Sequence, residues 1–315
     1  MIFDGRGPIG IWGRAWRGLI AGGLMLGPVV GLASGQGQEI AAQWQRLEQA
    51  RQVLLKSEAG LSLIRRASER FHVDLEHRPL TEGSGGFVSP GLASRTDSVL
   101  NRGIDPLTGL ETRAFETHIR LRATQPLEDV VLDFAHELTH AELSSPVDPY
   151  DPGLTAEKYI SKAITGAGGE VDAVAAECRI GLELADQYGL KMERCRKYQG
   201  AKGVDPRLIL SDFGASGRYR ALLIERLGFS SLSRMEWITD QEPEFYSSTG
   251  GLPYPAALLE EYDELTQAAC ANSRRRVELL SASAPERTPG SGQNRALKEA
   301  RHFLQSRCGY GATQR

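Results

Sequence analysis

The segment FAHELTHAEL, residues 134–143, constrains the fold of this chain more than any other stretch of its sequence. It places His136 and His140 four residues apart and puts Glu137 directly after the first histidine. In an α-helix this spacing sets both imidazoles one turn apart on the same face, so each can point a ring nitrogen at one metal ion. The Glu137 carboxylate is rotated away and reaches a water on that metal. The alternative is a surface helix that carries two histidines without binding anything.

A catalytic zinc needs a third protein ligand and keeps its fourth position for water. The segment GGEVDAVAAE, residues 168–177, offers carboxylates at the start of a second predicted helix. Small residues beside Glu170 allow this helix to approach the first one closely. We expect Glu170 to be the third ligand and retain Glu177, on the same face, as the alternative. The other interpretation of Glu170 is an acid that the helix dipole favours at a helix start.

The N-terminus has the layout of a secretory signal peptide. Three arginines, at positions 6, 14 and 17, precede the uncharged stretch 18–33, which ends in small residues suitable for cleavage. We expect residues 1–35 to be this signal peptide, and the protein to be secreted or periplasmic without a stable membrane anchor after cleavage. An uncleaved anchor is the alternative, but the stretch is short for a membrane span and contains Gly and Pro.

The four cysteines lie in the second half of the chain, at Cys178, Cys195, Cys270 and Cys308. None forms a CxxC pair, so we expect neither a thiolate zinc site nor a thioredoxin-like motif. An even number in an exported chain favours two disulfides, for which three pairings are possible. Proximity in sequence favours Cys178–Cys195 and Cys270–Cys308. The alternative is four buried thiols.

Composition narrows the class of protein. Hydrophobic residues make up 41% of the chain and charged residues 24%, which is typical of globular proteins rather than disordered ones. The net charge of −3 provides no basic surface for nucleic acid, so we expect no nucleic-acid partner. The sequence leaves the oligomeric state open.

Hydrophobic periodicity predicts a predominantly helical α+β fold. Residues 39–68 have a helical pattern, which Gly60 can break into two helices. The segments FHVDLEH (71–77), GGFVSP (85–90) and ETHIRLRA (116–123) predict a small sheet, because they are short and separated by turn residues. We expect this sheet to pack on the helix of the histidine pair and on the second ligand-bearing helix.

The chain divides into five predicted regions. After the signal peptide, a core with both ligand helices is followed by a helical C-terminal region, an exposed linker rich in Ser, Pro and Gly, and a terminal helix. Their predicted bounds are 1–35, 36–200, 201–280, 281–294 and 295–315.

HELTH followed by a helix that carries Glu-x-x-Ala resembles the gluzincin branch of the zincin metallopeptidases, whose best-known member is thermolysin. The spacing of Glu170, Ala173 and Ala176 is also similar to that of the membrane-bound CAAX-type endopeptidases, but those carry several membrane spans that this sequence does not suggest. A closer resemblance, over residues 87–187, is to secreted bacterial metallopeptidase-like domains of uncharacterised function.

The resemblance implies a secreted zinc metallopeptidase that cleaves a peptide or protein substrate. One Zn²⁺ per chain would be held by His136, His140 and Glu170. The metal would lower the pKa of its bound water, and Glu137 would act as general base. The competing hypothesis is a non-catalytic, secreted, disulfide-braced helical binding protein, whose metal site is structural or vestigial.

Three further roles stay open at this stage. Gluzincins often place an aspartate four residues after the third ligand to orient a zinc histidine, but Val174 stands there. Asp133 is our candidate for a partner behind the metal ligands, and the alternative is that it is a solvated acid. The resemblance implies that ETHIRLRA is an edge strand that pairs with substrate. Candidate donors to the oxyanion are Tyr246, Tyr254 and His118.

Overall fold

The computed structural model describes most of the chain, and its fold is α+β and predominantly helical, which confirms the predicted class. The predicted signal peptide lies outside the described residues apart from its last three positions, as do most of the predicted linker and the end of the chain. The described ranges are 33–82, 86–105, 111–191, 193–235, 242–247, 251–282 and 292–309.

Two helices open the fold, α1 (Ala33–Leu54) and α2 (Glu58–Phe71). They separate three residues earlier than the expected break at Gly60, because the Ser57 hydroxyl caps α2 by accepting the Gly60 backbone N–H at 3.1 Å. Gly60 serves a different purpose: a Cβ at this position would lie 2.2 Å from the Leu54 carbonyl oxygen. The glycine therefore permits close packing between consecutive helices rather than ending one.

The expected strand at residues 71–77 does not form. Helix α2 ends at His72, which adopts a left-handed conformation with φ of 53°. The buried Arg51 side chain of α1 then donates hydrogen bonds to the carbonyl oxygens of Leu75 and Glu76, at 2.8 and 2.9 Å. These carbonyls bind a guanidinium from the neighbouring helix, so they are not used in a sheet.

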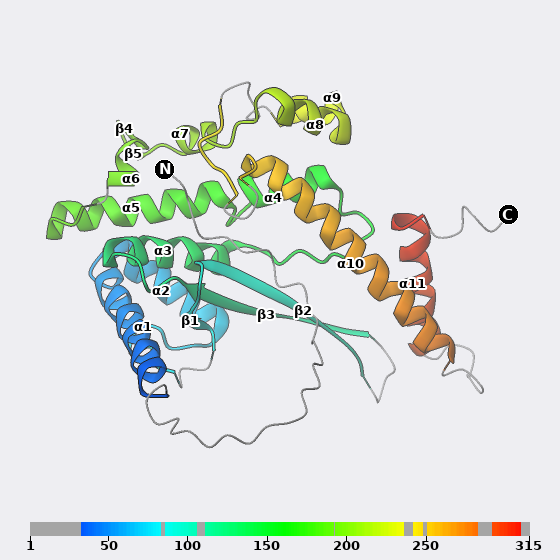
Figure 1. Cartoon of the computed structure of the whole chain (residues 1–315), viewed down its shortest axis with the longest axis horizontal. Helices are drawn as coiled ribbons and strands as arrows, with labels where there is room; N and C mark the ends of the chain where they lie inside the picture. The colour runs from blue at the N-terminus through cyan, green and yellow to red at the C-terminus, as the bar shows by residue number, and fades with distance from the viewer. Residues whose placement is uncertain are drawn as a thin grey trace, which may run out of the picture.

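The main sheet has three strands, in the order β1 (Val88–Pro90), β3 (Glu111–Leu121), β2 (Arg95–Ile104). β1 pairs in parallel with β3, and β2 pairs antiparallel with β3 along the whole length of β2. The prediction that residues 116–123 form an edge strand is wrong, because β3 is the central strand. Among the strands described, β1 and β2 form the two edges of this sheet, and the β2–β3 pair reaches towards the C-terminal helices (Figure 1).

Helix α3 (Leu127–Leu143) contains the histidine pair and lies at the centre of the molecule. It begins after Pro126, with two acids in its first turn that interact favourably with the helix dipole. It packs against α5 (Glu170–Tyr188) on one side and against α1, α2 and β3 on the other (Figure 1). Ten of its residues are buried, so the pair does not lie on a solvated surface helix.

The described residues after α5 are mostly helical. The long helix before the predicted linker continues to Ala282, and the last helix begins at Gly292. The remaining elements are α4 (Ala156–Thr165), α6 (Glu193–Arg196), β4 (Gln199–Gly200), β5 (Gly203–Val204), α7 (Pro206–Ser211), α8 (Gly217–Leu227), α9 (Phe229–Arg234), α10 (Tyr254–Ala282) and α11 (Gly292–Arg307).

Both predicted disulfide pairings are confirmed. Cys178–Cys195 joins α5 to the one-turn helix α6, and Cys270–Cys308 joins α10 to the end of α11. Such bonds persist in oxidising compartments, which accords with an exported protein. Among the residues that the structure places, no helix has both the length and the apolar character needed to span a bilayer.

Candidate metal centre

Three side chains meet in the space between α3 and α5. His136 and His140 project from one face of α3, and Glu170 is the first residue of α5. The two histidine Nε2 atoms are 3.0 Å apart. The Glu170 oxygens lie 3.3 Å from the Nε2 of His136 and 3.4 Å from that of His140. This group can hold a metal ion.

The spacing of these atoms fits a small tetrahedral cation. Zinc binds imidazole nitrogen and carboxylate oxygen at roughly 2.0–2.2 Å, so neighbouring ligand atoms in a tetrahedron lie about 3.3–3.5 Å apart. The N–O distances of 3.3 and 3.4 Å are close to that edge length and run to different oxygens of the Glu170 carboxylate, Oε2 for His136 and Oε1 for His140. The N–N distance of 3.0 Å is slightly shorter. A metal could therefore be held with little movement of the three side chains.

The hydrogen-bond partner of each Nδ1 atom determines the tautomer of each histidine ring. The Nδ1 of His136 lies 2.9 Å from Glu177 Oε2, and that of His140 lies 2.8 Å from the Gly168 carbonyl oxygen. Because a carboxylate and a carbonyl only accept hydrogen bonds, each Nδ1 must carry the hydrogen. The two Nε2 atoms then face one another at 3.0 Å, an arrangement that a proton between them or a metal ion beside them stabilises.

The electrostatics of the group also favour a cation. Burial alone would lower the pKa of His136, but hydrogen bonds and charges from Glu170 and Glu177 outweigh burial and raise its pKa from 6.5 to about 10. The carboxylates therefore stabilise positive charge at the ring. A proton on the ring supplies part of this positive charge, and a divalent metal ion would supply more.

The turn before α5 positions His140, and sequence reasoning missed its role. Gly168 has a φ of 66°, and its carbonyl accepts from both His140 Nδ1 and the Ser144 hydroxyl. A Cβ on Gly168 would lie 2.4 Å from the Ser144 backbone nitrogen. The Gly168 N–H donates to Asp172 at 3.0 Å, which closes the turn. The signal for this turn was GAGG directly before Glu170.

Glu177 does not lie where the alternative third metal ligand would have to be. Its Oε2 faces His136 Nδ1, on the opposite side of the ring from the converging Nε2 atoms. Only 1% of Glu177 is exposed. It therefore does not join Glu170 as a ligand but orients His136. It lies seven residues, or two helical turns, after Glu170 on α5.

Asp133 is one contact further from the histidines than we expected. Its carboxylate accepts from Ser94 and Gln125 at 2.5 and 2.7 Å and from Arg194 at 3.1 Å. The prediction that it contacts a metal histidine is therefore wrong. Its link to the centre passes through Arg194, whose Nε forms an ion pair of 2.9 Å with Glu177.

Arg194 is the second residue that sequence reasoning missed. Burial alone would lower its pKa, but the charges of Glu177 and Asp133 outweigh burial and raise it. A signal was present, because Arg194 precedes Cys195 and Glu177 precedes Cys178. The predicted disulfide between these cysteines already required the two charged neighbours to lie close together.

The structure brings one of the three candidate oxyanion donors to the group. Tyr254, at the start of α10, donates its hydroxyl hydrogen to Glu170 Oε1 at 2.6 Å. Tyr246 is 42% exposed, and its backbone forms an isolated bridge with Pro253. The His118 ring on β3 lies 3.1 Å from both Glu116 and the Gly86 carbonyl oxygen.

Glu137, the expected general base, is buried beside His136 with 5% of its surface exposed. Its backbone carbonyl accepts a hydrogen bond from the Thr96 hydroxyl at 2.8 Å. This bond joins the first residues of β2 to the helix turn that carries the histidine pair. The beginning of the strand and the motif are thereby fixed relative to one another.

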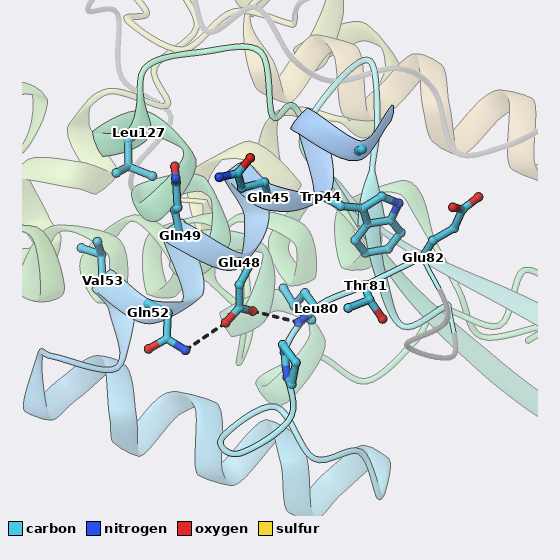
Figure 2. Close-up of a pocket in the computed structure, with 12 residues that line it drawn as sticks. Trp44, Gln45, Glu48, Gln49, Gln52, Val53, Leu80, Thr81, Glu82 and Leu127 are labelled. Carbon is cyan, nitrogen blue, oxygen red and sulfur yellow. Dashed lines mark hydrogen bonds between the residues drawn. The ribbon is translucent and has the colours of Figure 1, made fainter. Parts of the chain in front are cut away.

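A surface cavity of about 650 Å³ lies elsewhere, between α1, residues 79–82 and Leu127 (Figure 2). Its wall is largely apolar and includes Trp44. Its carboxylate, Glu48, is already bonded to the Leu80 N–H and the Gln52 amide, at 2.8 and 2.9 Å. None of its lining residues belongs to the histidine group.

Glu177, Cys178 and Cys195 also lie close enough together for a metal, but both sulfurs are in a disulfide and offer no thiolate. The histidine group is therefore the candidate metal centre. No protein-family model, curated protein or solved structure matches this chain.

Proposed function

We propose that this protein is a secreted zinc metallopeptidase of the gluzincin type. The observation that carries this proposal is the convergence of His136, His140 and Glu170, with Glu137 on the same helix as the histidines.

The donor set favours zinc over other common ions. Two imidazole nitrogens and one carboxylate oxygen match catalytic zinc sites, which use three protein ligands. Calcium and magnesium prefer sites made almost wholly of oxygen atoms. One such group is found in the described residues, which supports one Zn²⁺ per chain.

Each residue would contribute a separate part of the hydrolysis. A bound zinc ion would supply Lewis acidity, which acidifies a water molecule and polarises a carbonyl group. Glu137 would take the proton from that water and deliver it to the leaving amine. Tyr254, whose hydroxyl already reaches Glu170, could turn to donate to the carbonyl oxygen as negative charge develops there.

Strand β2 is the better candidate for binding an extended peptide. It is the longer of the two outer strands of the described sheet, and the Thr96 hydroxyl joins its beginning to the Glu137 carbonyl. Main-chain pairing along such a strand would bind peptides of many sequences. In this proposal the sheet packs on the catalytic helix and aligns substrate beside it, a role that we had assigned to β3.

Metal analysis and two substitutions test the proposal. The purified protein should contain about one zinc per chain. His140→Ala should lose this zinc, whereas Glu137→Gln should retain it and lose cleavage of a mixed peptide digest. If the Glu137→Gln variant cleaves peptides as fast as the parent protein, the proposed mechanism is wrong.

Burial of the group favours one alternative, a binding protein with a structural zinc. The side chains of His136 and Glu170 are each 5% exposed, and that of His140 is 17% exposed. Structural zinc sites are closed and stabilise the fold, whereas catalytic sites keep an open position. A parent protein that holds zinc, cleaves no peptide and unfolds on chelation would favour this alternative.

A further inference from the structure

We infer that Arg194, held in place by the Cys178–Cys195 disulfide, is a positioning residue for the metal centre. This inference rests on the part of the proposed function that assigns a metal to the histidine group. It does not require that the protein be a peptidase. It concerns how the ring of His136 and the two ligand-bearing helices are kept in place.

A continuous set of contacts leads from the disulfide to His136. Arg194 Nε lies 2.9 Å from Glu177 Oε1, and the other oxygen of Glu177 lies 2.9 Å from His136 Nδ1. One carboxylate oxygen thus faces each partner. The charge of the guanidinium favours this orientation of the carboxylate, and the carboxylate in turn orients the imidazole.

Arg194 also joins the two helices that carry the candidate ligands. Its Nη2 donates to Asp133 Oδ1 at 3.1 Å, and Asp133 lies on α3 one turn before His136. Its Nε pairs with Glu177 on α5, the helix that begins with Glu170. One guanidinium therefore bridges α3 and α5, whose separation determines whether the ligands can meet on one ion.

The disulfide holds α6 in a position that so short a helix could not keep by itself. Helix α6 has four residues, and isolated helices this short are unstable. Cys178 and Cys195 are fully buried, and their Cα atoms are 5.0 Å apart. Because the next residue towards the N-terminus is Glu177 in one case and Arg194 in the other, the covalent bond holds the ion pair together.

The first experiment measures zinc affinity in the full-length protein by competition with a chromophoric chelator. Arg194→Met should weaken zinc binding by about 10- to 100-fold, the usual effect of removing a group that orients a metal ligand. Arg194→Lys keeps the charge but loses the two-sided geometry of the guanidinium. Its zinc affinity should therefore lie between that of Arg194→Met and that of the parent. The control is Arg196→Met, because Arg196 is 70% exposed and pairs with Glu193 alone among the described ion pairs.

The second experiment removes the disulfide. The double variant Cys178→Ala/Cys195→Ala should weaken zinc binding. Adding Arg194→Met to it should cause a smaller further loss of zinc affinity than Arg194→Met causes in the parent, because both changes disrupt the same set of contacts. Cys270→Ala/Cys308→Ala is the matched control and should bind zinc as tightly as the parent. The absorption spectrum of cobalt-loaded protein should change with Arg194→Met and not with this control.

Thermal unfolding shows whether each variant is folded. If Arg194→Met does not fold, Arg194→Lys, which keeps the charge, replaces it in the comparison. Equal zinc affinity in a folded Arg194 variant and the parent would overturn the inference. Zinc binding by the parent without peptide cleavage would overturn only the proposed function, whereas a parent that binds no zinc would overturn both.

Discussion

Glu170 and Glu177 differ in the nitrogen of His136 that each one faces. Glu170 lies beside Nε2, where the ring can bind a metal, and Glu177 lies beside Nδ1, where it can only orient the ring. Both glutamates were predictable as acids on one face of a helix near the histidines. Which of them is the ligand depends on how α5 crosses α3, and helix periodicity does not contain that information.

Gly168 provides a test of the metal centre at a single backbone position. Gly168→Ala should lower the free energy of unfolding by about 1–3 kcal/mol, because alanine is strained at positive φ and the added methyl would meet Ser144. It should also weaken zinc binding at least tenfold, since the Gly168 carbonyl holds the His140 ring. Chemical denaturation and chelator competition measure the two effects.

Gly189 is the matched control for this prediction. It has the same φ of 66°, and a Cβ there would meet no atom within 4 Å. Gly189→Ala should therefore cost about 1 kcal/mol of stability from backbone strain and leave zinc affinity unchanged. Equal zinc affinity in the two alanine variants would refute a role for Gly168 in placing His140.

Glu48 should make stability depend on acid pH. Partial burial opposes its ionisation, but hydrogen bonds from Arg51, Gln52 and the Leu80 N–H outweigh burial and lower its pKa from 4.5 to about 2. Because the pKa is lower in the folded protein, the stabilisation is complete above about pH 4.5 and is lost as pH falls through about 2. After a discount for solvent screening it amounts to about 1–2 kcal/mol.

The difference in unfolding free energy between the parent and Glu48→Gln measures this contribution. It should be largest between pH 5 and 7 and should shrink steadily as the pH is lowered towards 3. A difference that stays constant over this range would show that the carboxylate charge of Glu48 does not stabilise the junction between α1 and the segment near Leu80.

At the scale of elements, local signals predicted helices better than strands. Helices α3 and α5 were predictable because acids in the first turn and apolar residues at helical spacing agree along each segment. The strand order was not, because β2 reads RTDSVLNRGI, with few apolar residues. Its place at one edge follows because β1, rather than β2, pairs in parallel with the other side of β3, which is a non-local contact.

The Cys270–Cys308 disulfide should hold α11 on α10. In the chain-entropy description, a bond across 38 residues stabilises the fold by about 4 kcal/mol. Replacing both cysteines with alanine should therefore lower stability by several kcal/mol and expose α11 first. Hydrogen exchange should show faster exchange in α11 while α3 and α5 stay protected. Uniform exchange along the whole chain would contradict such a local role.

At the scale of the whole molecule, α10 links the metal centre to the distant end of the sheet. Tyr254 at its beginning contacts Glu170, and Arg276 near its end donates to Glu111 of β3 at 2.8 Å (Figure 1). The C-terminal helical region therefore contributes to the centre. The sequence offered Tyr254 only as one of several candidates, because its reach depends on the path of a chain segment 84 residues after Glu170.

Tyr254→Phe tests whether this long-range contact serves chemistry or only metal binding. If the hydroxyl stabilises the oxyanion, kcat for peptide cleavage should fall by about 10²- to 10³-fold, while zinc content stays near one per chain. Tyr246→Phe is the control and should leave kcat unchanged, because that side chain is 42% exposed. A loss of zinc from Tyr254→Phe in proportion to the loss of activity would instead mean that Tyr254 holds Glu170 in place. The donor to the oxyanion would then have to come from another part of the chain.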